Sequence, residues 1–149
     1  MDTYTGAKPV ERRSYVAGRN GLLTAGLVGA GIALILVVGL IHLINSPEDL
    51  EAGSYTGMLY LANFLGALAA AVGIYRGRRW GWALGLLIAG GAFVAYLISR
   101  TVGLPGLPVE TEWLEPLGVL SLIVEVMFVG AFLAIFVRSQ ENTMHGGTS

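Results

Sequence analysis

Four long apolar stretches follow one another along the chain and are separated by short polar connections. They cover roughly residues 22–45, 58–75, 80–99 and 116–137. An α-helix rises about 1.5 Å per residue, so each stretch approaches the ~20 residues that cross a hydrocarbon core about 30 Å thick. The pattern therefore predicts an all-α fold, a bundle of four transmembrane helices.

Polar segments flank this predicted bundle. We expect a four-helix transmembrane domain at 21–138, between an N-terminal tail at 1–20 and a C-terminal tail at 139–149, both flexible because they are polar. The first apolar stretch follows a basic segment, as a secretory signal does. It is much longer than a signal core of about 7–15 residues and has no small-residue cleavage pattern, so we expect it to be retained.

Basic and acidic residues alternate between the polar segments. Short cytoplasmic segments of membrane proteins collect Lys and Arg, so this distribution predicts a multi-pass protein of the cell membrane with both termini cytoplasmic. Arg100 is the exception, because it lies at the outer end of the third stretch. The predicted cytoplasmic cations are Lys8, Arg12, Arg13, Arg19, Arg76, Arg78, Arg79 and Arg138, and the predicted outer acids are Glu48, Asp49, Glu51, Glu110, Glu112 and Glu115.

Composition agrees with a lipid environment and narrows the partners. Hydrophobic residues make up 54% of the chain and charged residues 13%, which suits a surface that faces lipid. The net charge of -1 averages over two oppositely charged surfaces, so it indicates no nucleic-acid partner. The absence of cysteine excludes thiol redox chemistry and thiolate metal sites. The expected partner is the bilayer, with a larger membrane complex or a homo-oligomer as further options.

Small residues recur at every fourth position of three predicted helices, and aromatic residues collect near the predicted membrane boundaries. Small-residue stripes let helix backbones approach closely, so we interpret them as intramolecular packing, with a dimer face as the alternative. The aromatic residues are interpreted as interfacial anchors. The stripes are Ala25, Gly29 and Ala33; Ala62, Gly66 and Ala70; and Gly81, Gly85 and Ala89, and the anchors are Tyr55, Tyr60, Tyr75, Trp80, Trp82 and Trp113.

Every predicted helix carries a polar residue in its outer half. Helical side chains lean toward the N-terminus of their helix, so Arg100 leans into the bilayer while Glu125 leans outward from the middle of the fourth helix. We therefore expect an ion pair between them, because an isolated charge in the membrane is costly. The alternative is a protonated Glu125 that donates to Ser121. The candidate ligand-binding or structural residues are His42, Asn63, Tyr96, Arg100 and Glu125.

Two functional interpretations remain open. The first is a small binding or accessory subunit with a polar pocket in the outer leaflet, and the second is a membrane enzyme or redox subunit that uses His42 and Glu125 with a metal or a quinone. No catalytic motif and no spaced pair of metal-binding histidines is present, so we favour a protein without enzymatic activity, cofactor or metal. The loop at 101–115 is either a cap over the polar residues or an interfacial turn anchored by Trp113.

One motif supports a resemblance. Residues 96–106 read Tyr-Leu-Ile-Ser-Arg-Thr-Val-Gly-Leu-Pro-Gly, residues 113–118 read Trp-Leu-Glu-Pro-Leu-Gly, and Glu125 follows. Together with His42 ahead of the Pro47-Glu48 pair, this stretch resembles a group of small four-helix prokaryotic integral membrane proteins of uncharacterised function. The resemblance implies an integral membrane protein and gives no catalytic residue to transfer.

Overall fold

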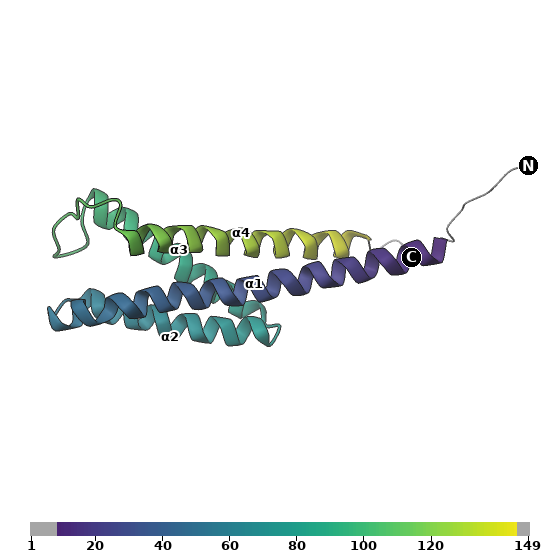
Figure 1. Ribbon diagram of the computed structural model, residues 1–149, viewed down its shortest axis with the longest axis horizontal. Helices are drawn as coiled ribbons and strands as arrows, with labels where there is room; N and C mark the ends of the chain where they lie inside the picture. Colours follow the sequence, from purple (N-terminus) through teal and green to yellow (C-terminus); the bar gives the residue numbers. More distant parts are fainter. Residues whose placement is uncertain (1–8, 146–149) are drawn as a thin grey trace, which may run out of the picture.

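The structure, a computed structural model, consists of four helices in the described part of the chain (Figure 1). It describes the backbone of residues 9–145 and the side chains of residues 21–140. The helices are α1 (Pro9–Glu51), α2 (Tyr55–Tyr75), α3 (Arg79–Thr101) and α4 (Pro116–His145). The predicted all-α fold with four helices is confirmed.

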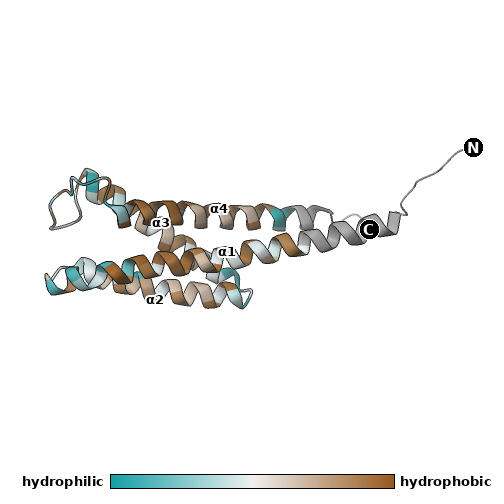
Figure 2. Cartoon of the chain, in the orientation of Figure 1, coloured by the Kyte–Doolittle hydropathy of each residue, from teal (hydrophilic) through white to brown (hydrophobic). Residues whose placement is uncertain are grey.

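All four helices are long and apolar enough to cross a membrane. The candidate spans are Gly21–Glu51, Tyr55–Tyr75, Arg79–Thr101 and Pro116–Gln140. Hydrophobic residues fill the middle of the helices, and hydrophilic residues lie mainly at the turns and the loop (Figure 2). Exposed leucine, valine and isoleucine side chains cover the outside of the bundle, which is the surface that a lipid environment favours. The chain is therefore a small multi-pass membrane protein.

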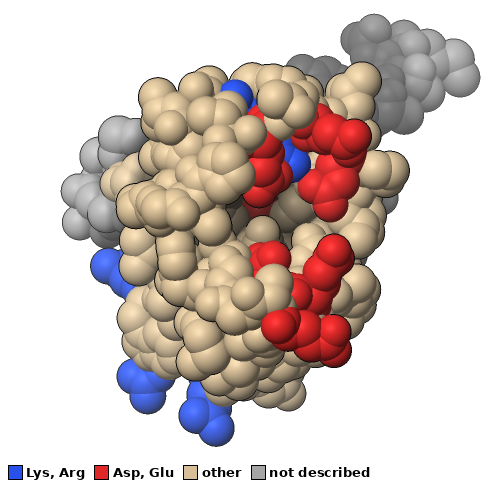
Figure 3. Space-filling view, turned by 90° about the vertical axis from the view of Figure 1, so that its left-hand side faces the viewer, with Lys and Arg blue, Asp and Glu red and all other residues tan. Residues whose placement is uncertain are grey.

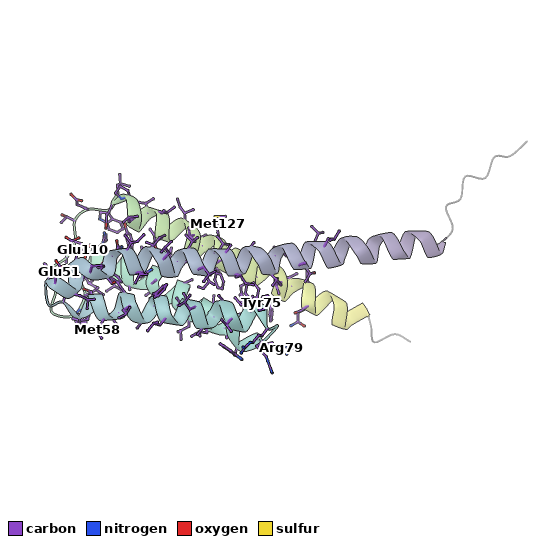
Figure 4. All side chains as sticks on the ribbon, turned by 60° about the horizontal axis from the view of Figure 1, so that its bottom comes forward. Glu51, Met58, Tyr75, Arg79, Glu110 and Met127 are labelled. Atoms are coloured by element: carbon purple, nitrogen blue, oxygen red, sulfur yellow. The ribbon has the colours of Figure 1, made fainter. Side chains whose placement is uncertain are left out.

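The helices pack in a ring in which each helix contacts the next one along the chain and α4 contacts α1. Figure 1 shows α3 crossing the bundle, from α2 at one end toward the start of α4 at the other. We call the end formed by the α1–α2 turn and the loop at 102–115 the acidic end, and the end formed by the turn at 76–78 the basic end. Figure 4 shows Glu51 and Glu110 at the acidic end and Arg79 at the basic end.

Helix boundaries differ from the sequence prediction at three places. The segments 9–20 and 139–145, predicted as parts of flexible tails, are helical, and the prediction for 1–8 and 146–149 lies outside the described residues. The acids expected in the first loop lie instead in the last turns of α1, which ends at Glu51. Two glycines with positive φ, Gly53 at 71° and Gly77 at 67°, reverse the chain after α1 and α2. A change from apolar to polar residues in the sequence therefore indicates where a helix leaves the membrane, but the helix itself can continue beyond that point.

Glycine and alanine bring the backbones together inside the bundle. The stripes on α2 and α3 pack as predicted at Gly66, Ala70, Gly85 and Ala89, and at Gly81, where the helices touch backbone to backbone next to Gly73. The stripe on α1 does not, because Ala25, Gly29 and Ala33 are exposed. Other glycines of α1 take its place: Gly39 faces Ala67, and Gly31 faces Trp82. Intramolecular packing is thus confirmed for the α3 stripe and for Gly66 and Ala70 of the α2 stripe, but not for Ala62, which is exposed, and it is wrong for the α1 stripe.

The hydrophobic core lies toward the middle of the bundle and consists mainly of residues with small side chains, together with a few large ones. Phe128 and Ile35 are fully buried, and Trp82 stacks on Phe128 with ring centroids 5.7 Å apart. Trp82 therefore packs inside the bundle, and its predicted role as an interfacial anchor stays a prediction. The core cluster comprises Ile35, Val38, Ala67, Ala70, Ala71, Ile74, Ala89, Val124 and Phe128.

We expect Gly81→Ala to lower the thermal stability of the detergent-purified protein. A Cβ at this position meets the Gly73 Cα at 2.8 Å, closer than real contacts allow. The overpacking cost is about 1–3 kcal/mol, which exceeds the gain of up to ~1 kcal/mol from alanine's higher helix propensity. The control is Gly90→Ala, where nothing lies within 4 Å. A Gly81→Ala protein that unfolds at or above the temperature of Gly90→Ala contradicts the close α2–α3 contact.

Candidate functional site

Arg100, in the last turn of α3, is buried and fully engaged by the loop that follows it. Its Nη2 donates to Glu115 Oε2 at 3.0 Å, its Nη1 donates to a carboxylate oxygen of Glu110, and its Nε donates to the carbonyl of Glu112 at 3.2 Å. The guanidinium also lies over the ring of Tyr96, 4.3 Å from the centroid. We call these five residues the arginine clasp. Cation–π contact and charge-assisted hydrogen bonds both stabilise a guanidinium in this setting.

The arginine clasp fixes the conformation of the loop at 102–115. The amide of Glu110 donates to the Ser99 carbonyl at 2.9 Å, and the Tyr96 hydroxyl donates to the Trp113 carbonyl at 2.7 Å. The loop also reaches α2, because the Tyr55 hydroxyl donates to the Pro105 carbonyl at 2.9 Å. Contacts to two different helices make the loop an ordered lid over part of the acidic end.

The predicted ion pair between Arg100 and Glu125 is wrong. Within the described side chains, both ion pairs involve Arg100, and their acids are Glu110 and Glu115. The long arginine side chain turns back toward the polar end of its helix. The loop carboxylates are 52% and 45% exposed, so they keep much of their hydration while they neutralise the arginine. Pairing with Glu125 requires two buried charges and is the costlier arrangement.

Glu125 is left in α4 with half of its carboxyl group unsatisfied. Its side chain is 2% exposed, its Oε1 accepts a hydrogen bond of 2.7 Å from the Ser121 hydroxyl, and its Oε2 has no hydrogen-bond partner. Ser121 lies one turn nearer the acidic end, so the carboxyl group points toward that end. The alternative expectation, a protonated Glu125 that donates to Ser121, is confirmed for the contact but not for its direction, because the Ser121 hydroxyl is the donor.

The surroundings of Glu125 toward the basic end are apolar. Phe128 packs against Gly85 and Tyr96 packs against Gly118, and these two contacts set the register of α3 and α4. Glu125 lies between them, close to Phe128 and next to Val124 of the hydrophobic core. The carboxyl group therefore has an apolar environment on its basic-end side.

His42 and Asn63 lie on the other helix pair, α1 and α2. The Nδ1 of His42 donates to the Val38 carbonyl at 2.9 Å, because a carbonyl only accepts, and the ring meets Tyr60 edge-on with centroids 5.4 Å apart. Asn63 follows Tyr60 by three residues, which places both on one face of α2. The Asn63 Oδ1 is buried and has no hydrogen-bond partner.

Tyr60 is a residue that sequence reasoning assigned to the membrane interface. It is half-buried, and its ring contacts His42 of α1. It therefore packs against α1 inside the bundle. The spacing of three residues to Asn63 was the sequence signal for this orientation.

The space-filling view of the acidic end shows acidic side chains in two groups with a hollow between them (Figure 3). One group comes from the end of α1 and the other from the loop at 102–115, and the loop group surrounds Arg100. The acids of this end are Glu48, Asp49, Glu51, Glu110, Glu112 and Glu115.

The predicted site residues thus fall into three sets of contacts. Tyr96 and Arg100 are together in the arginine clasp, Glu125 contacts Ser121, and His42 contacts Tyr60, one turn from Asn63. Within the part of the chain that the structure describes, no group of three or more histidine and acidic side chains is arranged to hold a metal ion. Two buried side-chain oxygens among the described residues, Asn63 Oδ1 and Glu125 Oε2, have no hydrogen-bond partner.

Comparison with known proteins found no matching family model, no matching curated protein and no matching solved structure. The resemblance to small prokaryotic membrane proteins therefore stays a prediction. The fold therefore defines the chain as a small four-helix membrane protein.

A double-mutant cycle tests the pairing of Arg100. We expect Arg100→Gln and Glu115→Gln to show a coupling energy of about 0.5–3 kcal/mol, because each removes one partner of the same hydrogen-bonded ion pair. Arg100→Gln and Glu125→Gln are expected to be additive within ~0.5 kcal/mol, because the two groups share no partner. Unfolding of the six proteins in one detergent measures both terms. Coupling to Glu125 without coupling to Glu115 contradicts the arginine clasp.

Proposed function

We propose that this chain is a binding or accessory subunit of the cell membrane that receives the polar group of a ligand, or of a partner subunit, in the hollow at its acidic end. The observation that carries the proposal is Glu125: a carboxyl group 2% exposed, with one oxygen unpartnered and pointed toward that end. A buried polar atom without a partner costs about 1–3 kcal/mol, so a protein that keeps one has a use for it.

The arginine clasp supports a binding role for Glu125. Among the side chains that the structure describes, Arg100 is the one lysine or arginine at the acidic end, and it is held by Glu110 and Glu115. Glu125 therefore keeps its oxygen available for an external group. The loop at 102–115 is tied to both α3 and α2, so it is suited to shaping an entrance.

We propose that the acidic end faces the outside of the cell and that both termini are cytoplasmic. The basic end carries Arg76, Arg78 and Arg79, as cytoplasmic turns of membrane proteins do. Arg100 was the exception to this rule, and the arginine clasp accounts for it, since two carboxylates neutralise its charge. A neutralised arginine does not oppose transfer of the loop across the membrane.

The alternative of a metal or quinone enzyme built on His42 and Glu125 has less support. The His42 Nδ1 donates to the Val38 carbonyl, and among the described side chains His42 contacts Tyr60 while Glu125 bonds to Ser121, with no hydrogen bond between His42 and Glu125. A binding role needs only the acceptors that are present.

Labelling of introduced cysteines tests the orientation. The chain contains no cysteine, so single variants give no background. In intact cells we expect Ser54→Cys and Thr111→Cys to react with a membrane-impermeant maleimide, and Ser139→Cys to react only after the membrane is permeabilised. The opposite pattern places the acidic end in the cytoplasm.

Accessibility and occupancy of the hollow test the binding role. In a mild non-ionic detergent we expect Asn63→Cys to react with a small water-soluble thiol reagent, while Ala67→Cys, buried one turn deeper in the core, stays unreactive. Native mass spectrometry of the wild-type protein is expected to show an additional small-molecule mass that Glu125→Gln reduces. An unreactive Asn63→Cys together with a protein free of additional mass contradicts the proposal.

A further inference from the structure

We infer that the hollow at the acidic end binds a cation that carries N–H donors, namely a protonated amine with an apolar substituent. This inference rests on the proposed binding function and names the chemical class of its ligand. The buried carboxyl group of Glu125, which keeps one oxygen without a hydrogen-bond partner, is the group that such a cation would meet.

Among the described side chains, the buried atoms without a hydrogen-bond partner are two oxygens, which accept hydrogen bonds when Glu125 is ionised. Glu125 Oε2 and Asn63 Oδ1 are buried without partners. A ligand that only accepts hydrogen bonds leaves these atoms unsatisfied, whereas an ammonium group presents up to three N–H donors.

Charge selects the same kind of ligand. The six acids of the acidic end outnumber its single arginine, and that arginine is bound to Glu110 and Glu115. The resulting negative field attracts cations to the entrance and opposes anions. Inside, the Glu125 carboxylate has no cation among the described side chains, and an isolated buried charge is costly. A cationic ligand neutralises it.

The apolar surroundings favour an organic cation over a metal ion. Val124 and Phe128 flank Glu125 in sequence and belong to the hydrophobic core. Ca²⁺ takes about 6–8 oxygen ligands, and Mg²⁺ keeps an octahedral shell. A single carboxylate beside a hydrocarbon surface does not supply them. A primary ammonium needs one carboxylate and a few neutral acceptors, and its alkyl chain fits the hydrocarbon side of the site.

The test uses octylammonium chloride as the probe and 1-octanol as its uncharged analogue. Each is titrated calorimetrically into the full-length protein in a non-ionic detergent, and empty micelles provide the blank. We expect the wild-type protein to bind octylammonium at least about tenfold more tightly than 1-octanol, since a charge-assisted hydrogen bond contributes about 1.5–3 kcal/mol. Octyltrimethylammonium, which carries the charge without N–H donors, is expected to bind more weakly than octylammonium.

Two matched variants separate Glu125 from the general negative charge. Glu125→Gln is expected to weaken octylammonium binding at least about tenfold, because it removes the charge but keeps the size of the side chain. Glu51→Gln removes the same charge at an exposed position and is expected to change the affinity less than about twofold, because exposed charges are screened. Circular dichroism and the unfolding temperature report whether both variants are folded.

Each outcome decides the inference. Equal affinity for octylammonium and 1-octanol in the wild-type protein overturns it without any variant, as does an equal loss in Glu51→Gln and Glu125→Gln. Binding of Ca²⁺ or Mg²⁺ that depends on Glu125, without octylammonium binding, also overturns it. If Asn63→Cys is reactive and a bound mass is found while octylammonium fails, the binding function stands and only the cation is wrong. If the hollow is neither reactive nor occupied, both fail.

Discussion

The neutralisation of Arg100 by the loop that follows α3 is the interaction on which the arrangement of the acidic end depends. A guanidinium at the end of a membrane helix can pair inward with a buried carboxylate or outward with hydrated ones. The structure uses the outward pairing, with Glu110 and Glu115, and adds the Tyr96 ring beneath the guanidinium. Two consequences follow: the loop is tied down across the end of the bundle, and Glu125 remains without a cation.

The bundle itself is held together by close backbone approach. In lipid there is little hydrophobic force between helices, so packing and hydrogen bonds decide which faces meet. Gly73, Gly81, Gly85 and Gly39 supply the flat surfaces, and Phe128 and Trp82 fill the space that remains. Most large aliphatic side chains are left on the outside, where the membrane is their solvent.

Hydrophobic patterning was sufficient to predict the four helices. In the membrane each segment must form all its backbone hydrogen bonds internally, and the thickness of the bilayer sets the length of the helix. The patterning was not sufficient for the helix ends, since α1 continues beyond the apolar stretch in both directions.

The contacts between side chains were harder to predict than the helices. Cβ direction placed Arg100 inward, but a long flexible side chain with five donors can reverse that direction when carboxylates lie in the next loop. The Ser121–Glu125 contact was predictable because a helix fixes neighbours four residues apart. The His42–Tyr60 contact was not, because it depends on the rotation of α1 against α2.

The backbone contact between Gly73 and Gly81 has a mechanical consequence for the two ends of the molecule. Where two helices touch without intervening side chains, no rotamer change is available to let them separate, so this contact acts as a pivot. The helix pairs diverge with distance from it, and a small angular change at the basic end becomes a larger displacement at the acidic end. The same leverage makes the tyrosine bridge from α2 to the loop, Tyr55 to Pro105, a limit on how far the far end can spread. A change in the angle between α2 and α3 is thus felt mainly at the acidic end and hardly at the basic end.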